Sequence, residues 1–432
     1  MKKLIALILT LALALSLAAC GGSGSGGGTT SGGGAAAEGE GITIFNSKSE
    51  IQSQMEEMAE RYTEETGVPV EIYYSSDTVA AHLSTRYASN DPYTLMMVDA
   101  KDVYSMGEEY AVDMSDQDWV KDTQYAITVN DKVLGFPVCV EARGLIYNAS
   151  AIEAITGTTF NPEDYKTTDA FKGLLDQLVA GGMATPVGIM KEDWSLGAHY
   201  LAEFYEEQPD VNAYIDELYA GTADVAGNEK FNSLMDTFDV LKQYNYAAES
   251  PVAAERELSE QKLAEGEIAF MFGGNWDWSM IAEYDYTDGL GMMAVPQNMD
   301  DGTNEKLVGG GSKFFMIDSS ANTSDTQRQE AKDFLNWLVY NEDGQKFVTE
   351  DCALIPAYSN IEATNLDPLG ASVKKYADAG QMIDNYNYFP DDHYSVLGGS
   401  GMQKYLAGEI DRAGLAQTIV DYWKNVTPVA HG

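Results

Sequence analysis

The sequence predicts an α/β fold in a chain of more than one domain. Between Ile42 and Asp99, short apolar runs alternate with amphipathic helical segments. This alternation is typical of βαβ units and of a parallel sheet flanked by helices. The chain from about Ile42 onwards is also long enough to form two separate hydrophobic cores. We therefore expect mainly parallel sheets divided between two domains.

The spacing of apolar residues predicts each element of this fold. Short runs of apolar residues predict strands at 42–46, 68–74, 95–99, 268–272 and 313–317. Apolar residues three and four positions apart predict helices around 51–62, 82–88, 170–178, 231–241, 331–339 and 415–423. Gly67 is placed to end the first helix, and the pair Gly273-Gly274 is placed to break the strand at 268–272.

The N-terminus has the features of an export signal. Lys2 and Lys3 precede an apolar run at 4–17, which suits a signal peptide and is too short to span a bilayer. The signal peptide is expected at 1–19, and its end at Cys20 resembles the lipobox of bacterial lipoproteins, in which this cysteine is lipidated. The alternative is an ordinary signal peptide with an incidental cysteine. Residues 21–41 are rich in Gly and Ser, and we expect a disordered linker with a reach of about 25 Å.

Net charge excludes one class of partner. The 26 basic and 68 acidic residues give −42, or −44 once Lys2 and Lys3 are removed with the signal (26 − 2 − 68). A surface of this charge repels phosphate backbones, so we expect no nucleic-acid partner. The two other cysteines, Cys139 and Cys352, are compatible with a disulfide outside the cell and equally with two buried thiols.

No pattern in the sequence indicates an enzyme. It has no phosphate loop, no HExxH motif and no Gly-x-Ser-x-Gly elbow. The four histidines are scattered without the spacing of metal ligands. The 68 acidic residues make coincidental carboxylate pairs unavoidable, so such pairs carry no signal for glycoside cleavage. We expect no catalysis, no cofactor and no metal.

Four segments, taken in order, resemble the extracellular solute-binding proteins of ATP-driven (ABC) importers, in the branch that includes maltose-binding protein. The first is a strand ending in an acid (91–99), and the second is a Gly-x-Pro segment with a following Tyr-Asn pair (133–148). The third is a helix followed by a strand and a tryptophan (262–276), and the fourth is a C-terminal helix (406–423). The resemblance extends from about Ile42 to Asn425. Cys139 departs from the family pattern, in which a polar or aromatic residue is more usual after Gly-x-Pro.

The resemblance implies a two-lobe, periplasmic-binding-protein-like fold of type II, with strands crossing between the lobes at a hinge. The expected lobes are 42–140 plus 273–318 and 141–272 plus 319–432. The implied function is capture of a carbohydrate, expected to be an oligosaccharide, between the lobes. An ABC permease would receive it, and the lipid on Cys20 would hold the protein at the outer face of the cell membrane. The alternatives are a polyamine or other small polar solute, or a sensory or adhesive lipoprotein.

Candidate ligand-binding residues include aromatic rings near strand ends. Sugars present weakly polar faces that stack on rings, and hydroxyls that bind planar polar groups. We expect Trp276 to be a stacking platform with Asn275 as its polar neighbour, because both follow a strand, and ligands in α/β sheets bind at strand carboxyl ends. The alternative is that Trp276 packs against the following helix. Trp194 is a candidate for an opposing ring, whereas Trp278 is expected to pack against the protein.

Polar candidates lie beyond three other strands. Asp99 ends its strand and is expected to accept from a sugar hydroxyl, the alternative being a helix-capping role for Asp102 and its neighbours. Glu141 and Arg143 are two residues apart on an extended segment and therefore face the same side, either clamping ligand jointly or pairing with each other. Lys48 follows the first strand and either reaches the ligand or is an ordinary solvated charge. Gly310, within the run Gly309–Gly311, permits close approach of backbone N–H groups to ligand or serves a tight hinge.

Overall fold

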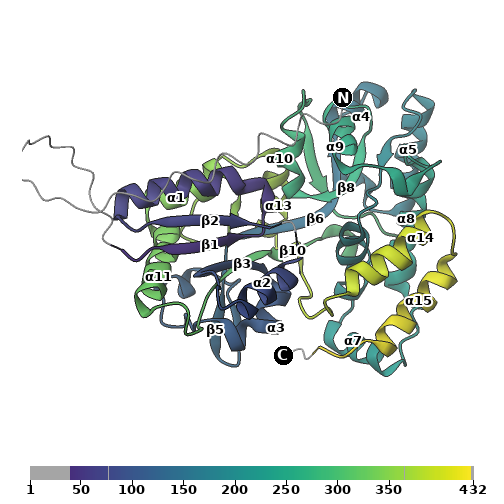
Figure 1. Cartoon of the computed structure of the whole chain (residues 1–432). Coiled ribbons are helices and arrows are strands. Elements are labelled where there is room, and N and C mark those ends of the chain that lie inside the picture. The colour runs from purple at the N-terminus through teal and green to yellow at the C-terminus, as the bar shows by residue number, and fades with distance from the viewer. Residues whose placement is uncertain (1–38, 76, 364, 430–432) are drawn as a thin grey trace, which may run out of the picture. The chain divides into compact units, whose positions relative to one another are not determined.

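Two β-sheets with helices against their faces organise the protein, and the α/β fold class is confirmed (Figure 1). This computed structural model describes residues 39–75, 77–363 and 365–429. The predicted signal peptide at 1–19, the predicted lipidation site Cys20 and linker residues 21–38 lie outside the described residues.

Six strands of the described residues form the first sheet, which begins with the predicted βαβ units. In spatial order they are β2 (Val70–Tyr74), β1 (Ile42–Asn46), β3 (Leu95–Asp99), β11 (Lys313–Ile317), β5 (Lys132–Pro137) and β4 (Ile127–Val129). The helices that accompany this sheet are α1 (Gln52–Thr66), α2 (Val79–Ala88), α3 (Ala100–Tyr110) and α11 (Asp325–Tyr340). Gly67 ends α1 with a φ of 77°, as predicted from the sequence.

The second sheet is centred on β6 (Cys139–Asn148), which follows β5 after a single residue. Its order is β13 (Met382–Asp384), β10 (Leu307–Gly311), β6, β8 (Phe270–Gly274) and β7 (Val187–Gly188), and β9 (Leu290–Met293) and β12 (Ile355–Pro356) also pair with β6. The other α-helices are α4 (Ala149–Thr156), α5 (Thr168–Ala180), α6 (Glu203–Glu206), α7 (Val211–Ala220), α8 (Glu229–Tyr244), α9 (Arg256–Ala264), α10 (Trp278–Ile281), α12 (Glu342–Lys346), α13 (Pro368–Asp378), α14 (Gln403–Leu406) and α15 (Arg412–Asn425).

Both sheets are mixed, which differs from the mainly parallel sheets expected. β1 runs parallel to β2 and β3, but β11 runs antiparallel to β3 and β5, and β6 runs antiparallel to β8, β9, β10 and β12. β6 and β11 enter their sheets directly from the neighbouring sheet, and antiparallel pairing needs no crossover helix. The predicted strand break at Gly273-Gly274 is wrong, because both glycines remain in β8 opposite Gly144 and Arg143.

Alternate strand residues enter cores on opposite faces of each sheet. In β3, Leu95 and Met97 pack in the core that contains α1 and α11, whereas Met96 and Val98 pack in the core that contains α2 and α3. Met271 of β8, in the second sheet, belongs to the same core as Leu95. One apolar core therefore continues from the first sheet into the second.

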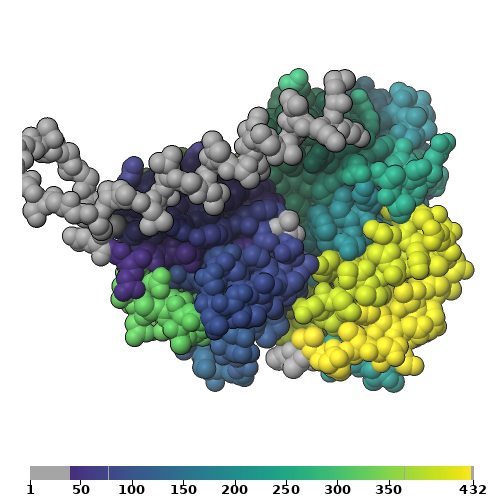
Figure 2. Space-filling model, viewed as in Figure 1, coloured from purple at the N-terminus to yellow at the C-terminus, as the bar shows by residue number. Residues whose placement is uncertain are grey.

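The predicted lobe boundaries, 42–140 plus 273–318 and 141–272 plus 319–432, remain a proposal. Sheet membership favours shifting them: β9 and β10 belong to the second sheet, and α11 contacts β1 and β11 of the first. The chain crosses to the second sheet at β5–β6, returns at β10–β11 and crosses again between α11 and β12. After this last crossing, the C-terminal helices α14 and α15, in yellow, lie against the teal segments of the chain (Figure 2).

The first two crossovers are hydrogen-bonded to each other. Val138 N donates to Lys313 O at 2.7 Å, and Ser312 N donates to Cys139 O at 3.2 Å. Each bond joins the connecting residue of one crossover, Val138 or Ser312, to the first strand residue after the other crossover, Lys313 or Cys139. The two connections therefore form one short double-stranded link between the sheets.

Two residues of the predicted linker are held by the folded protein. Gly41 N donates to Glu330 Oε2 at 2.9 Å and Glu40 N donates to Glu330 Oε1 at 3.0 Å. Gln327 Nε2 also donates to Gly41 O at 3.1 Å. The prediction of disorder through residue 41 is therefore wrong at its last residues, because α11 supplies hydrogen-bonding partners for their backbone.

Two π-helical turns, η4 (Ser195–Tyr200) and η9 (Tyr394–Met402), pack backbone against backbone. A Cβ atom added to Gly197 would lie 2.7 Å from Tyr394 O, and one added to Gly398 would lie 2.0 Å from Asp193 O. Only glycine permits this approach. The contact fixes the position of the turn that carries Trp194.

Substituting Gly398 by alanine is expected to destabilise the protein, with Gly399 as a matched control. The added Cβ at 398 must displace the carbonyl of Asp193, and overpacking of this kind costs about 1–3 kcal/mol of unfolding free energy. A Cβ at Gly399 meets nothing within 4 Å, so Gly399→Ala should leave stability unchanged or raise it by up to about 1 kcal/mol. Urea unfolding of both variants tests this, and equal stabilities would contradict the packing described.

His393 is buried in an aromatic cluster between α6, η9 and α15. Its ring stacks on Phe389 with centroids 4.4 Å apart, and the rings of Tyr205 and Trp423 lie at 5.6 and 5.5 Å. The residue is 1% exposed. Burial lowers the pKa of His393 to about 3, because the apolar surroundings disfavour the imidazolium ion.

Acid should destabilise the wild-type protein more than His393→Phe. Below about pH 6.5 the unfolded chain binds a proton at His393, while the folded protein does so only near pH 3. As the pH falls through this window, the unfolding free energy of the wild type should therefore drop by up to about 1.4 kcal/mol per pH unit more than that of His393→Phe. Denaturant unfolding at pH 7, 6 and 5 measures the difference, and parallel pH dependences would show that His393 does not contribute.

Candidate functional site

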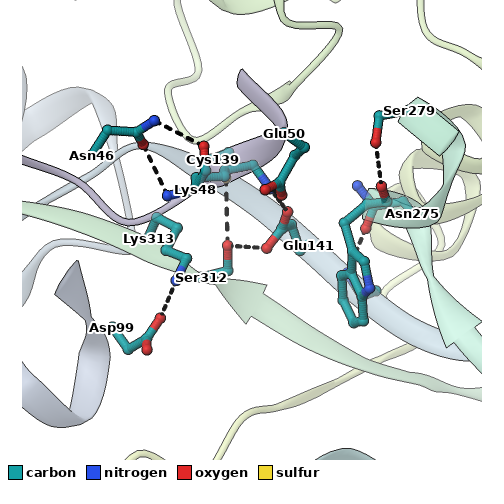
Figure 3. Close-up of polar contacts among 12 residues, drawn as sticks. Asn46, Lys48, Glu50, Asp99, Cys139, Glu141, Asn275, Ser279, Ser312 and Lys313 are labelled. Carbon is teal, nitrogen blue, oxygen red and sulfur yellow. Dashed lines mark hydrogen bonds and ion pairs between the residues drawn. The ribbon is translucent and has the colours of Figure 1, made fainter. Parts of the chain in front are cut away.

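Buried ionic groups gather where the chain crosses between the two sheets (Figure 3). Lys48, 3% exposed, donates from Nζ to Glu141 Oε1 at 2.6 Å and to Glu50 Oε1 at 2.5 Å. Ser312 Oγ donates to the other carboxylate oxygen of Glu141 and lies 3.4 Å from Cys139 Sγ. Lys48 and Glu141 were both predicted from the sequence, and the structure places them in direct contact.

The contacts of Lys48 and Glu141 with each other and with their neighbours keep both groups charged. Burial disfavours the ammonium ion of Lys48, but the carboxylates of Glu141 and Glu50 prevail and raise its pKa. Burial likewise disfavours ionised Glu141, but the charge of Lys48 and the hydrogen bonds from Lys48 and Ser312 lower its pKa. Both groups are therefore ionised at neutral pH and neutralise each other.

Asp99 forms a second ion pair beside the first. It stands opposite Lys313 in the pairing of β3 with β11, and Lys313 Nζ donates to Asp99 Oδ1 at 2.5 Å. Burial would raise the pKa of Asp99, but the charges of Lys313 and Lys101 lower it. The Asp99 side chain remains 41% exposed, so it is able to accept a further hydrogen bond. Asp102 Oδ2 accepts from Asp99 N at 3.1 Å at the start of α3.

Arg143 binds different partners from Glu141, although the two lie two residues apart on β6. Its Nη1 donates to Asn385 Oδ1 at 2.7 Å, and its Nη2 donates to Glu206 Oε2. The other oxygen of Glu206 accepts from Tyr386 N at 3.0 Å. Of the two alternatives for Glu141 and Arg143, their pairing with each other is not seen, because each has its own counter-ion, and joint contact with a ligand remains a prediction.

Asn275 and Trp276 follow β8 directly, in the short helix η6 (Asn275–Asp277). Asn275 is buried, and its Oδ1 accepts from Ala142 N at 2.9 Å, which ties η6 to β6. A Cβ at Gly274 would lie 2.2–2.5 Å from atoms of the Trp276 ring. The ring of Trp276 therefore lies against the glycine and is half-buried.

The role of Trp194 as a ring opposing Trp276 remains a prediction. Both tryptophans contact His199, with ring centroids 5.2 Å from Trp194 and 4.9 Å from Trp276. Arg256 covers Trp194 with its guanidinium carbon 4.5 Å from the ring centroid. Trp278 packs on Tyr286 at 5.1 Å, in keeping with the packing role expected for it.

Gly310 lies in β10 opposite Glu141 and has a φ of 154°. A Cβ at this position would have only Asn385 Nδ2 within 4 Å, at 3.8 Å. Gly309–Gly311 thus extend a strand up to the crossover at Ser312, and Gly310 is itself buried.

Ser312, Lys313 and His199 were not singled out from the sequence. Ser312 and Lys313 directly follow the run Gly309–Gly311, itself a candidate for approaching ligand, and this adjacency was the signal that went unused. His199 is five residues after Trp194, a spacing that places two side chains on one side of a helix only in a π-turn.

Among residues 39–75, 77–363 and 365–429, no three His, Cys, Asp or Glu side chains are arranged to hold a metal ion. No helix in the same ranges combines the length and apolarity that a bilayer span requires.

The same fold occurs in solved structures of binding proteins. RafE in complex with raffinose superposes with a TM-score of 0.75 at 19% identity, covering 89% of this chain and 98% of that one. The apo form of RafE from Streptococcus pneumoniae gives 0.70 at 20% identity, covering 89% and 97%. A sugar transporter protein from Bacillus licheniformis in complex with stachyose gives 0.66 at 18% identity, covering 89% and 99%.

At such low identity, these structures show the fold but not the family of the chain. A family model shows the family. The model described as bacterial extracellular solute-binding protein matches residues 57–381, well over half of the 432-residue chain. The matched region contains both sheet crossovers, Asp99, Glu141, Trp194 and Trp276. The chain belongs to the family of bacterial extracellular solute-binding proteins.

Proposed function

We propose that this protein binds a neutral carbohydrate between its two lobes. The observation that carries the proposal is the pairing of Asp99 with Lys313 and of Glu141 with Lys48. A polyamine needs carboxylates free to hold ammonium groups, and here lysines already occupy both predicted acids. A sugar needs hydrogen-bonding groups without net charge, which these ion pairs supply.

Aromatic rings next to the ion pairs favour the same ligand class. Trp276 and Trp194 are half-buried, and Asn275 joins Trp276 to the strand that carries Glu141. Rings stack on the weakly polar faces of sugars while charged and amide groups bind the hydroxyls. Solved structures of the same fold contain raffinose, mannotriose and stachyose, which agrees with this proposal.

The ligand would then be delivered to an ABC permease without chemical change. Ligand held between the lobes stabilises their closed arrangement, which the permease would recognise. At about 0.3 kcal/mol per heavy atom, a disaccharide gains about 7 kcal/mol, which corresponds to a Kd near the micromolar range and permits release. Lipidation at Cys20 would keep the protein at the outer face of the membrane, as the lipobox-like sequence suggests.

Calorimetry at two salt concentrations tests the ligand class. We expect an oligosaccharide from a panel of plant and bacterial sugars to bind, with a Kd that changes less than about twofold between 50 and 500 mM NaCl, because a neutral ligand is not screened by salt. Spermidine and putrescine are the comparison ligands. Binding of a polyamine but of no sugar, with an affinity that falls steeply as salt rises, would contradict the proposal.

Replacing Trp276 by alanine should weaken sugar binding by about 1–3 kcal/mol, the size of a buried aromatic contribution. Trp278→Ala is the matched control, since that ring packs on Tyr286. We expect the control to bind sugar like the wild type once thermal melting shows that both variants are folded. An unchanged affinity in Trp276→Ala would assign Trp276 to packing alone.

A further inference from the structure

Three rings from two separate segments form a row next to the ion pairs. His199 lies between the tryptophans, with centroid distances of 5.2 Å to Trp194 and 4.9 Å to Trp276. The ring planes are inclined by 79° and 51°, so neither pair is a closed sandwich. All three residues are half-buried, and the row is therefore partly accessible from outside the protein.

A π-turn creates one half of this row. Leu201 N donates to Leu196 O at 2.9 Å, a bond between residues five positions apart. In an α-helix, side chains five positions apart point about 140° away from each other, but the wider π-turn brings Trp194 and His199 to one side. The glycine contact between Gly197 and η9 holds this turn in place.

Each tryptophan is supported on the protein side. Arg256 stacks on Trp194 at 4.5 Å and is itself held by Asp277 and by Ser195 Oγ, the latter at 3.1 Å. Trp276 rests against Gly274, where a side chain would overlap the ring. Rings supported in this way keep their orientation, which lowers the entropy lost when a ligand stacks on them.

His199 contributes a ring without adding charge. Burial, with the positive charges of Arg143 and Arg256, holds the pKa of the imidazole well below its usual value. The neutral ring therefore suits a neutral ligand and continues the aromatic surface between the two tryptophans.

We propose that His199 is a specificity-determining residue, and that the row Trp276–His199–Trp194 binds successive units of an oligosaccharide. This inference rests on the proposed carbohydrate function and extends it to ligand length. A single sugar unit covers one ring, whereas a chain of two or more units is able to contact neighbouring rings of the row. Longer sugars should therefore bind more tightly than monosaccharides, and His199 should carry much of the difference.

Two series of sugars, each from one unit to four, test the proposal by calorimetry. They are galactose, melibiose, raffinose and stachyose, and glucose, maltose, maltotriose and maltotetraose. In at least one series, the wild type should bind the trisaccharide at least 100-fold more tightly than the monosaccharide. His199→Ala should weaken trisaccharide binding about tenfold or more while changing monosaccharide binding less than about twofold. His199→Phe, which restores a ring, should recover most of the lost affinity.

His82→Ala is the matched control, since His82 also stacks in an aromatic group, with Phe45 at 4.8 Å and Tyr93 at 5.8 Å, but on α2, which accompanies the first sheet. It should retain the preference for the trisaccharide. Equal affinity of the wild type for one and three units, or an unchanged length preference in His199→Ala, would overturn the inference while leaving the carbohydrate function standing. Failure of the wild type to bind any sugar of either series would overturn the carbohydrate function and the inference together.

Discussion

The structure depends on the two adjacent crossovers, where β5 passes into β6 and β10 passes into β11. Backbone hydrogen bonds join these crossovers, and the Lys48–Glu141 and Lys313–Asp99 pairs lie around them. A buried charge is costly unless it is paired, so each lysine needs its acid and each acid its lysine. The link between the sheets and the polar part of the site are thus built from the same residues.

This arrangement gives the candidate acids Asp99 and Glu141 a lysine partner each, within a protein that is strongly acidic as a whole. The net charge of −42 is carried by the chain as a whole, but the acids at the crossovers are compensated within hydrogen-bonding distance. Ion pairs in this state still present oxygen and nitrogen atoms to a hydroxyl. Recognition of a neutral ligand then depends on shape, stacking and hydrogen bonds instead of net charge.

The fold could be predicted from the sequence because apolar spacing reports which faces are buried. β1, β3, α1 and α11 were found in this way, and so was the stop at Gly67. The direction of β6 and β11 could not be predicted. Strand direction depends on which sheet the chain comes from, and apolar spacing is the same in both directions.

The residues of the candidate site could be named from the sequence, but most of their contacts could not. Lys48, Glu141, Asp99, Asn275 and Trp276 were named from their places after strands, but the lysine partner of Asp99 was not, since β3 and β11 are more than 200 residues apart in sequence. The position of His199 depends on a π-turn, which hydrophobic spacing does not predict.

The most direct test of carbohydrate binding at the crossovers is a crystal structure of the protein with its tightest-binding oligosaccharide. We expect a sugar face stacked on Trp276, hydroxyls bonded near the crossovers, and Lys48–Glu141 and Lys313–Asp99 pairs that persist in the complex. A sugar bound away from Trp276, or a ligand that replaces either lysine at its carboxylate, would contradict it.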